Sequence, residues 1–272
     1  MVSNLLEHEI DDILRTKLSE TNDTLLVVDP SANAIKSLVD IATTFDGETP
    51  TINLLADNGT LKDVMEDFLV ASSAANLVGD GVLAVRNLET DVDNSLLVTD
   101  DAVHAVVRAE EAVAALGTDD EGFVEGAVTT YEELFAAADP FNLRTPAIDE
   151  VRETLDEEIG DATREDFDHV LASLETARGD GEGLDEVTIS LLVAAKNDEL
   201  LYDISKWGED VGIASKATFS RTKTQLEEME LIDTEKVPID VGRPRLRLKL
   251  GDDRLKQADS NQLASIAQSM LN

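Results

Sequence analysis

The sequence contains no cysteine, three histidines and few aromatic residues. Without cysteine, the chain forms neither disulfide bonds nor thiolate metal sites. The histidines, at positions 8, 104 and 169, do not form an H-E-x-x-H zinc motif, and the phosphate loop and the G-x-S-x-G motif are absent from the sequence. The remaining candidates for catalysis are Asp and Glu side chains, and no motif assigns any of them a catalytic role. We therefore expect no enzymatic activity, no cofactor and no metal site.

Basic residues and long apolar runs are also scarce. The chain has 22 Lys and Arg against 58 Asp and Glu, a formal net charge of −36. No apolar run reaches the length that spans a membrane, and the first 20 residues lack the apolar block of a signal peptide. These features predict a cytoplasmic protein without a membrane partner.

Despite its acidity, the chain has enough apolar residues to form a core, since 42% of it is hydrophobic. Excess carboxylate opposes a compact state through self-repulsion. At about 1 M salt the screening length falls to about 3 Å, and most of that repulsion disappears. The composition therefore favours a salt-rich cytoplasm such as that of a haloarchaeon. An acidic protein that binds basic partners is the alternative.

The charge is unevenly distributed along the chain. Residues 213–250 carry 8 basic and 6 acidic residues, a net-positive stretch that indicates a negatively charged partner. Three glycines alternate with charged residues just before residue 184, a pattern that favours a linker at residues 179–183. We expect an acidic regulatory domain at 1–178, a second domain at 184–250 and a terminal helix at 251–272.

The first domain alternates strand and helix patterns. Buried-strand runs occur at residues 24–29, 51–57, 81–86 and 95–100, and helical periodicity occurs between the first three of them. This order predicts an α/β domain with a mainly parallel sheet and flanking helices.

Four carboxylates follow the predicted strands, namely Asp29, Asp57, Asp100 and Asp101. Ligands of open α/β sheets bind outside the carboxyl ends of the strands, so a pocket for an effector or a cation is one interpretation. The other is that Asp simply ends strands and caps helices, as it does in many proteins.

Residues 184–229 favour three helices. The second helix covers about 204–211 with Trp207 in the core, Gly212 provides the turn, and Ser215 caps the third helix. One face of the third helix combines cations with small hydroxyls, a mixture suited to phosphates and base edges in the major groove. The candidate DNA-binding residues there are Ser215, Lys216, Thr218, Ser220, Arg221, Lys223 and Thr224.

A strand with two different faces follows. Arg243, Arg245, Arg247 and Lys249 alternate with Leu246, Leu248 and Leu250. Because alternate strand residues face opposite ways, we expect the leucines to pack on the helices and the cations to point outward.

Residues 184–250 resemble the winged helix-turn-helix of archaeal and bacterial transcription regulators, through GIASKATFSRTKTQLEEMELI followed by VGRPRLRLKL. The whole chain resembles the haloarchaeal regulators of the TbsP type. The resemblance implies an α+β winged helix-turn-helix whose third helix enters the major groove of double-stranded DNA. Its hairpin would hold flanking phosphates or the minor groove through Arg243, Arg245 and Arg247. It also implies transcriptional control in central carbon metabolism, alongside a TrmB-type regulator.

Two further questions stay open at this level. The third helix of one chain contacts too few base pairs to specify a DNA site, so we expect a homodimer on a palindromic site. The apolar helices at the two chain ends either associate with another copy or cap their own domains. The alternative function is a winged-helix adaptor that docks on another regulator without contacting DNA.

Overall fold

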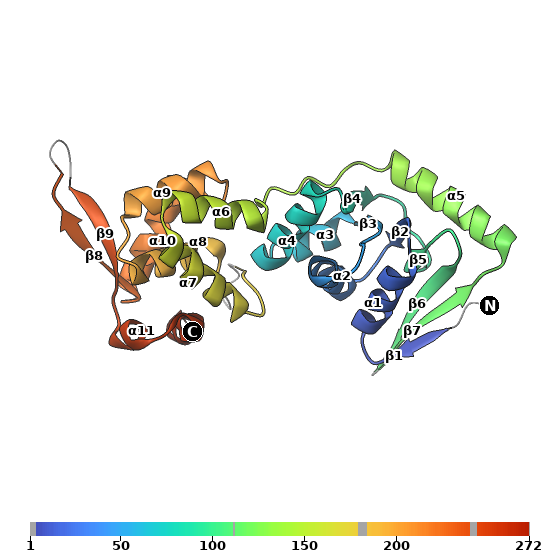
Figure 1. The fold of residues 1–272 in the computed structure, drawn as a ribbon, viewed down its shortest axis with the longest axis horizontal. Helices are drawn as coiled ribbons and strands as arrows, with labels where there is room; N and C mark the ends of the chain where they lie inside the picture. Colours follow the sequence, from blue (N-terminus) through green and yellow to red (C-terminus); the bar gives the residue numbers. More distant parts are fainter. Residues whose placement is uncertain (1–3, 111, 179–183, 240–243, 272) are drawn as a thin grey trace. The chain divides into compact units, whose positions relative to one another are not determined.

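The computed structural model describes residues 4–110, 112–178, 184–239 and 244–271. The chain divides into two compact units, each described by itself (Figure 1). The first unit comprises Met1–Glu66 and Ser73–Leu143, and the second comprises Asp67–Ser72 and Arg144–Asn272. This division precedes the boundary expected at residues 179–183, which lie outside the described residues. It does so because α6 (Ile148–Glu158) and α7 (Asp161–Ala172) pack in the core of the second unit.

The first unit is built on a seven-stranded sheet with helices on both faces. Its strands are β1 (Leu5–Glu7), β2 (Thr24–Val28), β3 (Thr51–Asp57), β4 (Leu83–Leu88), β5 (Leu96–Val98), β6 (Val103–Ala109) and β7 (Ala112–Thr118). Its helices are α1 (Ile10–Glu20), α2 (Ala32–Thr44), α3 (Asn58–Val64), α4 (Phe68–Gly79) and α5 (Glu121–Ala137), although the start of α4 groups with the second unit.

The sheet is mixed, and the expectation of a mainly parallel sheet is wrong. Its strand order is β1-β7-β6-β5-β2-β3-β4, and only the β2–β3 and β3–β4 pairs are parallel. β5 runs antiparallel to β2, with Val27 opposite Leu97. The physical reason is that no crossover helix separates β5, β6 and β7, and short connections join these three strands as antiparallel neighbours. β1, β6 and β7 were not among the predicted strands.

Helices cover the two faces of this sheet unequally (Figure 1). On one face, Ile10 and Leu14 of α1 and Ala34 of α2 enclose a cavity of about 180 Å³ over Val27 and Leu97. On the other face, α5 packs on β2, β5 and the start of β6 through the side chains Val124, Ala127, Val128, Tyr131 and Phe135. The first unit therefore has a layered α/β core centred on β2 and β5.

The apolar helices near the chain ends cap their own units. Ile10, Ile13, Leu14 and Leu18 of α1 are buried in the first unit, and residues 5–7 form β1 instead of extending the helix. α12 (Ser260–Leu271) buries Leu263 and Ala267 in the core of the second unit. Among the described residues, no helix combines the length and apolarity needed to cross a bilayer.

The second unit is a helical domain with a two-stranded hairpin. Besides α6, α7 and α12 it contains α8 (Glu186–Lys196), α9 (Leu201–Asp210), α10 (Lys216–Glu228), β8 (Ile232–Val237), β9 (Arg245–Leu250) and α11 (Asp253–Gln257). α8 is buried almost all round, which places it at the centre of this core. Trp207 is fully buried, as predicted, and its Nε1 donates a hydrogen bond to Thr154 Oγ1 at 2.9 Å.

His104 of β6 is an unusual member of the first core. It is 1% exposed, and neither ring nitrogen has a hydrogen-bond partner among the described residues. Burial, together with the nearby Lys17 ammonium, lowers the pKa of His104 below its ordinary 6.5, while Glu20 opposes this shift. The fold therefore favours the neutral imidazole.

This burial predicts a loss of stability in mild acid. As pH falls below 6.5, the unfolded chain binds a proton at His104 before the folded chain does. The free energy of unfolding should then fall by about 1.4 kcal/mol per pH unit until the lowered folded pKa is reached. Chemical denaturation at pH 7.5 and 5.5 measures this slope. In His104→Leu the free energy of unfolding should fall less steeply with pH, because the contribution of this imidazole is gone. An identical slope in both proteins would contradict the prediction.

Candidate nucleic-acid interface

α8, α9 and α10 form the helix-turn-helix of the second unit. Gly212, with φ of +91°, forms the turn after α9, where L side chains are strained. Ser215 begins α10, and its Oγ accepts a hydrogen bond from the Thr218 amide at 3.2 Å. Phe219 and Leu226 are buried on the inner face of α10. The cap and the apolar spacing place α10 as the sequence predicted.

Gly208 allows α9 and α10 to approach closely. A Cβ at position 208 would overlap the Phe219 ring, which is fully buried and has little room to move. Gly208→Ala should therefore lower the free energy of unfolding by about 1–3 kcal/mol through overpacking. Denaturation followed by Trp207 fluorescence measures the change. Gly126→Ala on α5 is the control, since nothing lies within 4 Å of its new Cβ, and an equal loss in both variants would contradict this reason.

The outer face of α10 carries several polar side chains without ionic partners. Ser220, Arg221 and Thr224 are exposed, and the Thr224 hydroxyl donates to the Ser220 carbonyl at 3.0 Å. Within the part of the chain that the structure describes, the Arg221 side chain forms no ion pair. Its guanidinium is thus available for a planar acceptor.

The two lysines of α10 are already paired. Lys216 Nζ lies 2.6 Å from Glu209 Oε2 of α9, and both side chains are more than 40% exposed. Lys223 is only 12% exposed and pairs with Glu227 Oε2 at 2.7 Å, while Glu227 Oε1 accepts from Thr234 Oγ1 of β8. The structure therefore does not bring Lys223 onto the exposed face with Arg221, although sequence spacing grouped them.

β8 and β9 pair antiparallel as a wing, and their side chains alternate as expected except at Leu246, which is half-buried instead of packed in the core. Leu248 and Leu250 are buried in the core, while Arg245, Arg247 and Lys249 point to the opposite face. An isolated bridge between Leu200 and Arg247 adds the start of α9 to the outer edge of β9. Arg243 lies outside the described residues.

The expected row of free cations is instead largely matched by the chain's own carboxylates. Arg245 Nη1 lies 3.2 Å from Asp203 Oδ1, and Lys249 Nζ lies 2.7 Å from Asp198 Oδ2. Arg247 faces Glu235 across the hairpin, and its Nε is buried without a hydrogen-bond partner among the described residues. Strand alternation identified the face, but it did not show that the loop before α9 and the first turn of α9 would supply acidic neighbours. Arg245 and Lys249 keep about a third of their surface exposed, so these pairs remain open to solvent.

A hollow of about 540 Å³ separates α10 from the wing. Lys216 and Ser220 line it from α10, Tyr202 and Ser205 from α9, and Leu246 from the wing. Tyr202 was not among the predicted site residues. The Arg245 guanidinium lies 4.3 Å from the centre of its ring, a contact set by the bridge to β9. Lys236, exposed on β8, was missed as well.

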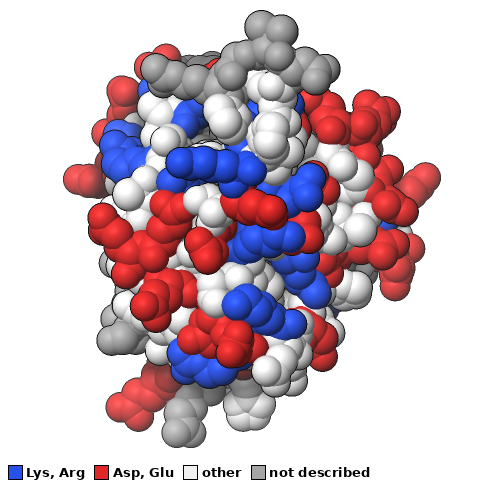
Figure 2. Space-filling model, turned by 90° about the vertical axis from the view of Figure 1, so that its left-hand side faces the viewer, with Lys and Arg blue, Asp and Glu red and all other residues white. Residues whose placement is uncertain are grey.

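Basic side chains gather on this face of the molecule. Figure 2 shows Lys and Arg in a narrow band on the end that carries the wing, interrupted by Asp and Glu and flanked by them on both sides. A phosphate backbone would therefore meet a narrow basic strip rather than a broad positive field.

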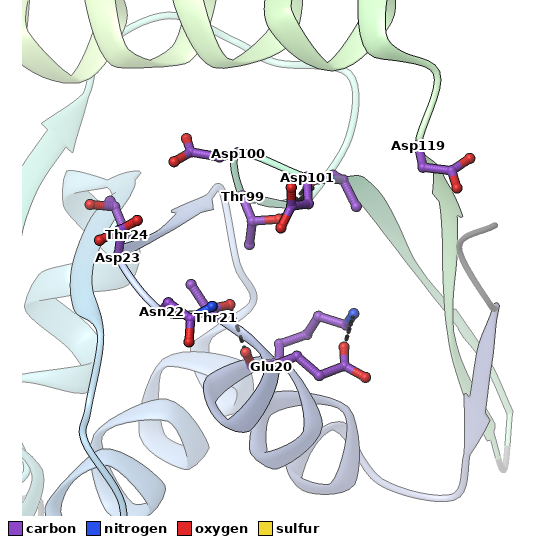
Figure 3. Close-up of a pocket in the computed structure, with 11 residues that line it drawn as sticks. Glu20, Thr21, Asn22, Asp23, Thr24, Thr99, Asp100, Asp101 and Asp119 are labelled. Carbon is purple, nitrogen blue, oxygen red and sulfur yellow. Dashed lines mark hydrogen bonds and ion pairs between the residues drawn. The ribbon is translucent and has the colours of Figure 1, made fainter.

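The four strand-end carboxylates of the first unit do not form one site. Asp29 and Asp57 lie at one edge of the sheet, where burial and then Asp57 raise the pKa of Asp29. Asp100 and Asp101 line a pocket of about 310 Å³ at the opposite edge, together with Lys17 and Asp119 (Figure 3). The separation follows from the antiparallel β5, whose end lies beside the start of β2. Among the described residues, no group of three or more His, Cys, Asp or Glu side chains could hold a metal ion.

Comparisons with known proteins agree with this architecture. Residues 2–146 match the family model described as "Transcriptional regulator TbsP-like, N-terminal", and residues 147–268 match "Transcriptional regulator TbsP-like, C-terminal HTH domain". The comparison with curated proteins gave no match.

Two solved structures show limited similarity. TrmBL2, an archaeal chromatin protein, is 14% identical with a TM-score of 0.37, over 52% of this chain and 54% of that chain. The chain thus spans about half the length of that structure. NucT from Helicobacter pylori is 11% identical with a TM-score of 0.32, over 51% of this chain and 99% of that chain.

Proposed function

The chain belongs to the TbsP-like transcriptional regulators, a family of regulators with a DNA-binding helix-turn-helix domain and not of enzymes, and we propose that it binds specific DNA sequences through α10. The observation that carries this proposal is the outer face of α10. It presents Arg221 without an ionic partner among the described residues, beside the exposed hydroxyls of Ser220 and Thr224. In the major groove, such a set bonds guanine edges and phosphates.

The other predicted residues of the third helix take supporting roles in this proposal. Ser215 and Thr218 hold the start of α10, where backbone amides face a phosphate favourably. Lys216 exchanges Glu209 for a phosphate, since the pair is half exposed. Lys223 orients Glu227 toward β8 and positions the wing rather than contacting DNA.

The wing contacts the flanking backbone through Arg243, Arg245 and Arg247. For Arg245, the approach of a phosphate replaces the Asp203 carboxylate at the edge of the hollow. Backbone contacts of this kind position a protein without selecting sequence. Arg245→Ala should therefore weaken binding to all duplexes equally.

Freeing the Arg245 guanidinium should strengthen binding. Asp203→Asn removes the competing carboxylate, so affinity for any duplex should rise about two- to fivefold, the range of an exposed ion pair. Fluorescence anisotropy with a random-sequence duplex in fixed high KCl measures it. Asp210→Asn is the matched control, because Asp210 pairs with Lys206 on the same helix. Equal gains in both variants would assign the effect to net charge instead of to the wing.

Several finer features belong to the same proposal. The net charge of −36 supports a haloarchaeal, salt-rich cytoplasm, where recognition depends on base contacts and shape because counterion release contributes little. A homodimer on an inverted repeat follows from the short reach of one α10. Control of central carbon metabolism alongside a TrmB-type regulator is carried over from the family resemblance. The proposal also includes a small-molecule effector of unknown identity that binds to the first unit.

Chromatin capture in cells grown at high salt tests the function. The proposal expects discrete genomic sites that share an inverted repeat, and purified protein should shift that sequence in molar KCl. The second candidate is a protein-binding adaptor, which the pairing of Arg245 and Lys249 with the chain's own carboxylates favours. If the chain is such an adaptor, its occupancy of genomic sites should disappear when a partner protein is deleted. The purified chain should then cause no gel shift of the DNA.

A further inference from the structure

One face of the first unit's sheet is open, apolar and uncharged over β1, β7 and the end of β6. The register aligns Leu6 of β1 with Ala114 of β7 and Ala114 with Val107 of β6, while Leu116 aligns with Ala105. Leu6 is 72% exposed, Leu116 49% and Val107 46%. Alternation also places Val103, which α5 buries, and the polar Thr118 on this side. The open sheet face is defined as the other residues that alternation places there: Leu6, Ala105, Val107, Ala109, Ala112, Ala114 and Leu116.

Alternation in β7 shows that the opening is confined to one side. Val113 and Ala115 are buried on the side covered by α1, whereas Leu116 is exposed and Ala114 is half-buried on the other. α5 covers that other side only over β2, β5 and the start of β6. The strands β1 and β7 and the end of β6 extend beyond it (Figure 1). Phe123, 58% exposed in the first turn of α5, adds a large apolar side chain close in sequence to the end of β7.

The composition of the open sheet face is unusual for this chain. An antiparallel sheet that faces water on one side normally carries polar residues there. Charged residues make up 29% of the sequence, yet none of the seven positions is charged. Contiguous exposed apolar surface of this kind marks an interaction site.

We propose that a second copy of this chain covers the open sheet face, in a two-fold symmetric dimer. A basic partner would gain most on the carboxylate-rich surfaces and little on an uncharged one. Two copies that each carry −36 repel least where neither presents a carboxylate, and an isologous two-fold contact pairs this face with itself. The choice of a second copy also rests on the proposed function, since one α10 reads too few base pairs alone.

The mass of the full chain in molar KCl tests this proposal. Sedimentation equilibrium should give twice 29.4 kDa for the wild type. Leu116→Glu and Leu116→Lys should each raise the dimer dissociation constant at least 100-fold, since both bury a charge whatever its sign. Val78→Glu is the matched control, because Val78 of α4 is also exposed but lies off the open sheet face, and it should stay dimeric. Leu6→Glu repeats the test at the most exposed position, where unfolding is not expected.

The alternative results are decisive. A monomeric wild type, or Leu116 and Leu6 variants that keep the wild-type dimer with unchanged circular dichroism, would overturn the proposal. DNA binding separates it from the proposed function. Monomeric Leu116→Glu should still bind a single half-site like the wild type while losing affinity for the full inverted repeat. A wild type that dimerises through this face but binds no DNA would leave the dimer standing and refute the proposed function.

Discussion

Arg221→Ala is expected to weaken site selection by this regulator strongly. Among the described residues, Arg221 is the one cation of α10 without an ion pair, whereas Lys216 and Lys223 are held by Glu209 and Glu227. A bidentate contact between arginine and guanine contributes about 1–3 kcal/mol of discrimination. The ratio of operator to random-sequence affinity should therefore fall about 5- to 150-fold, while random-sequence affinity changes little.

Competition binding in constant high KCl measures that ratio. Arg221→Lys keeps the positive charge but should not restore selection, because an ammonium lacks the planar pair of donors. Arg254→Ala provides the control for loss of one positive charge, since Arg254 lies at α11 and pairs with Asp252. If Arg221→Ala lost specific and random binding in equal measure, Arg221 would be a phosphate contact and not a reading residue.

The second large effect is loss of the fold at low salt. With a net charge of −36, repulsion extends over about 10 Å at 0.1 M salt but only about 3 Å at 1 M. Dialysis from molar KCl to about 0.1 M should unfold the chain reversibly. Trp207, the one tryptophan, is fully buried, so its emission should shift to the red as the second unit opens.

Screening can be separated from a general strengthening of apolar burial. Sucrose favours compact states without screening charge, so it should restore the fold at 0.1 M KCl only weakly. Unchanged Trp207 emission and circular dichroism at 0.1 M KCl would show that the carboxylates are spaced well enough to need no screening. The acidity would then require another explanation, such as a basic partner.

Much of the second unit was predictable from the sequence because its signals are local. Ser215 as cap, Phe219 and Leu226 as the buried face, and alternation along β9 each depend on residues a few positions apart. The same locality identified β2 and β3 in the first unit. It failed for β7, whose alanine-rich segment is nearly apolar on both faces and shows no clear period, and for β6, where His104 and Arg108 are the only polar residues among apolar ones.

The sequence by itself determined the net charge, the three helices of the helix-turn-helix and the identity of the candidate DNA-binding residues. Only the tertiary structure decided which cations are available. Asp198 and Asp203 reach the wing because a bridge at Leu200 brings the start of α9 to β9, a pairing between segments more than 40 positions apart. It also decided that Asp29 and Asp100 lie at opposite edges and that one sheet face stays open. Strand direction and helix cover depend on which distant segments meet, and no periodicity within a segment records that choice.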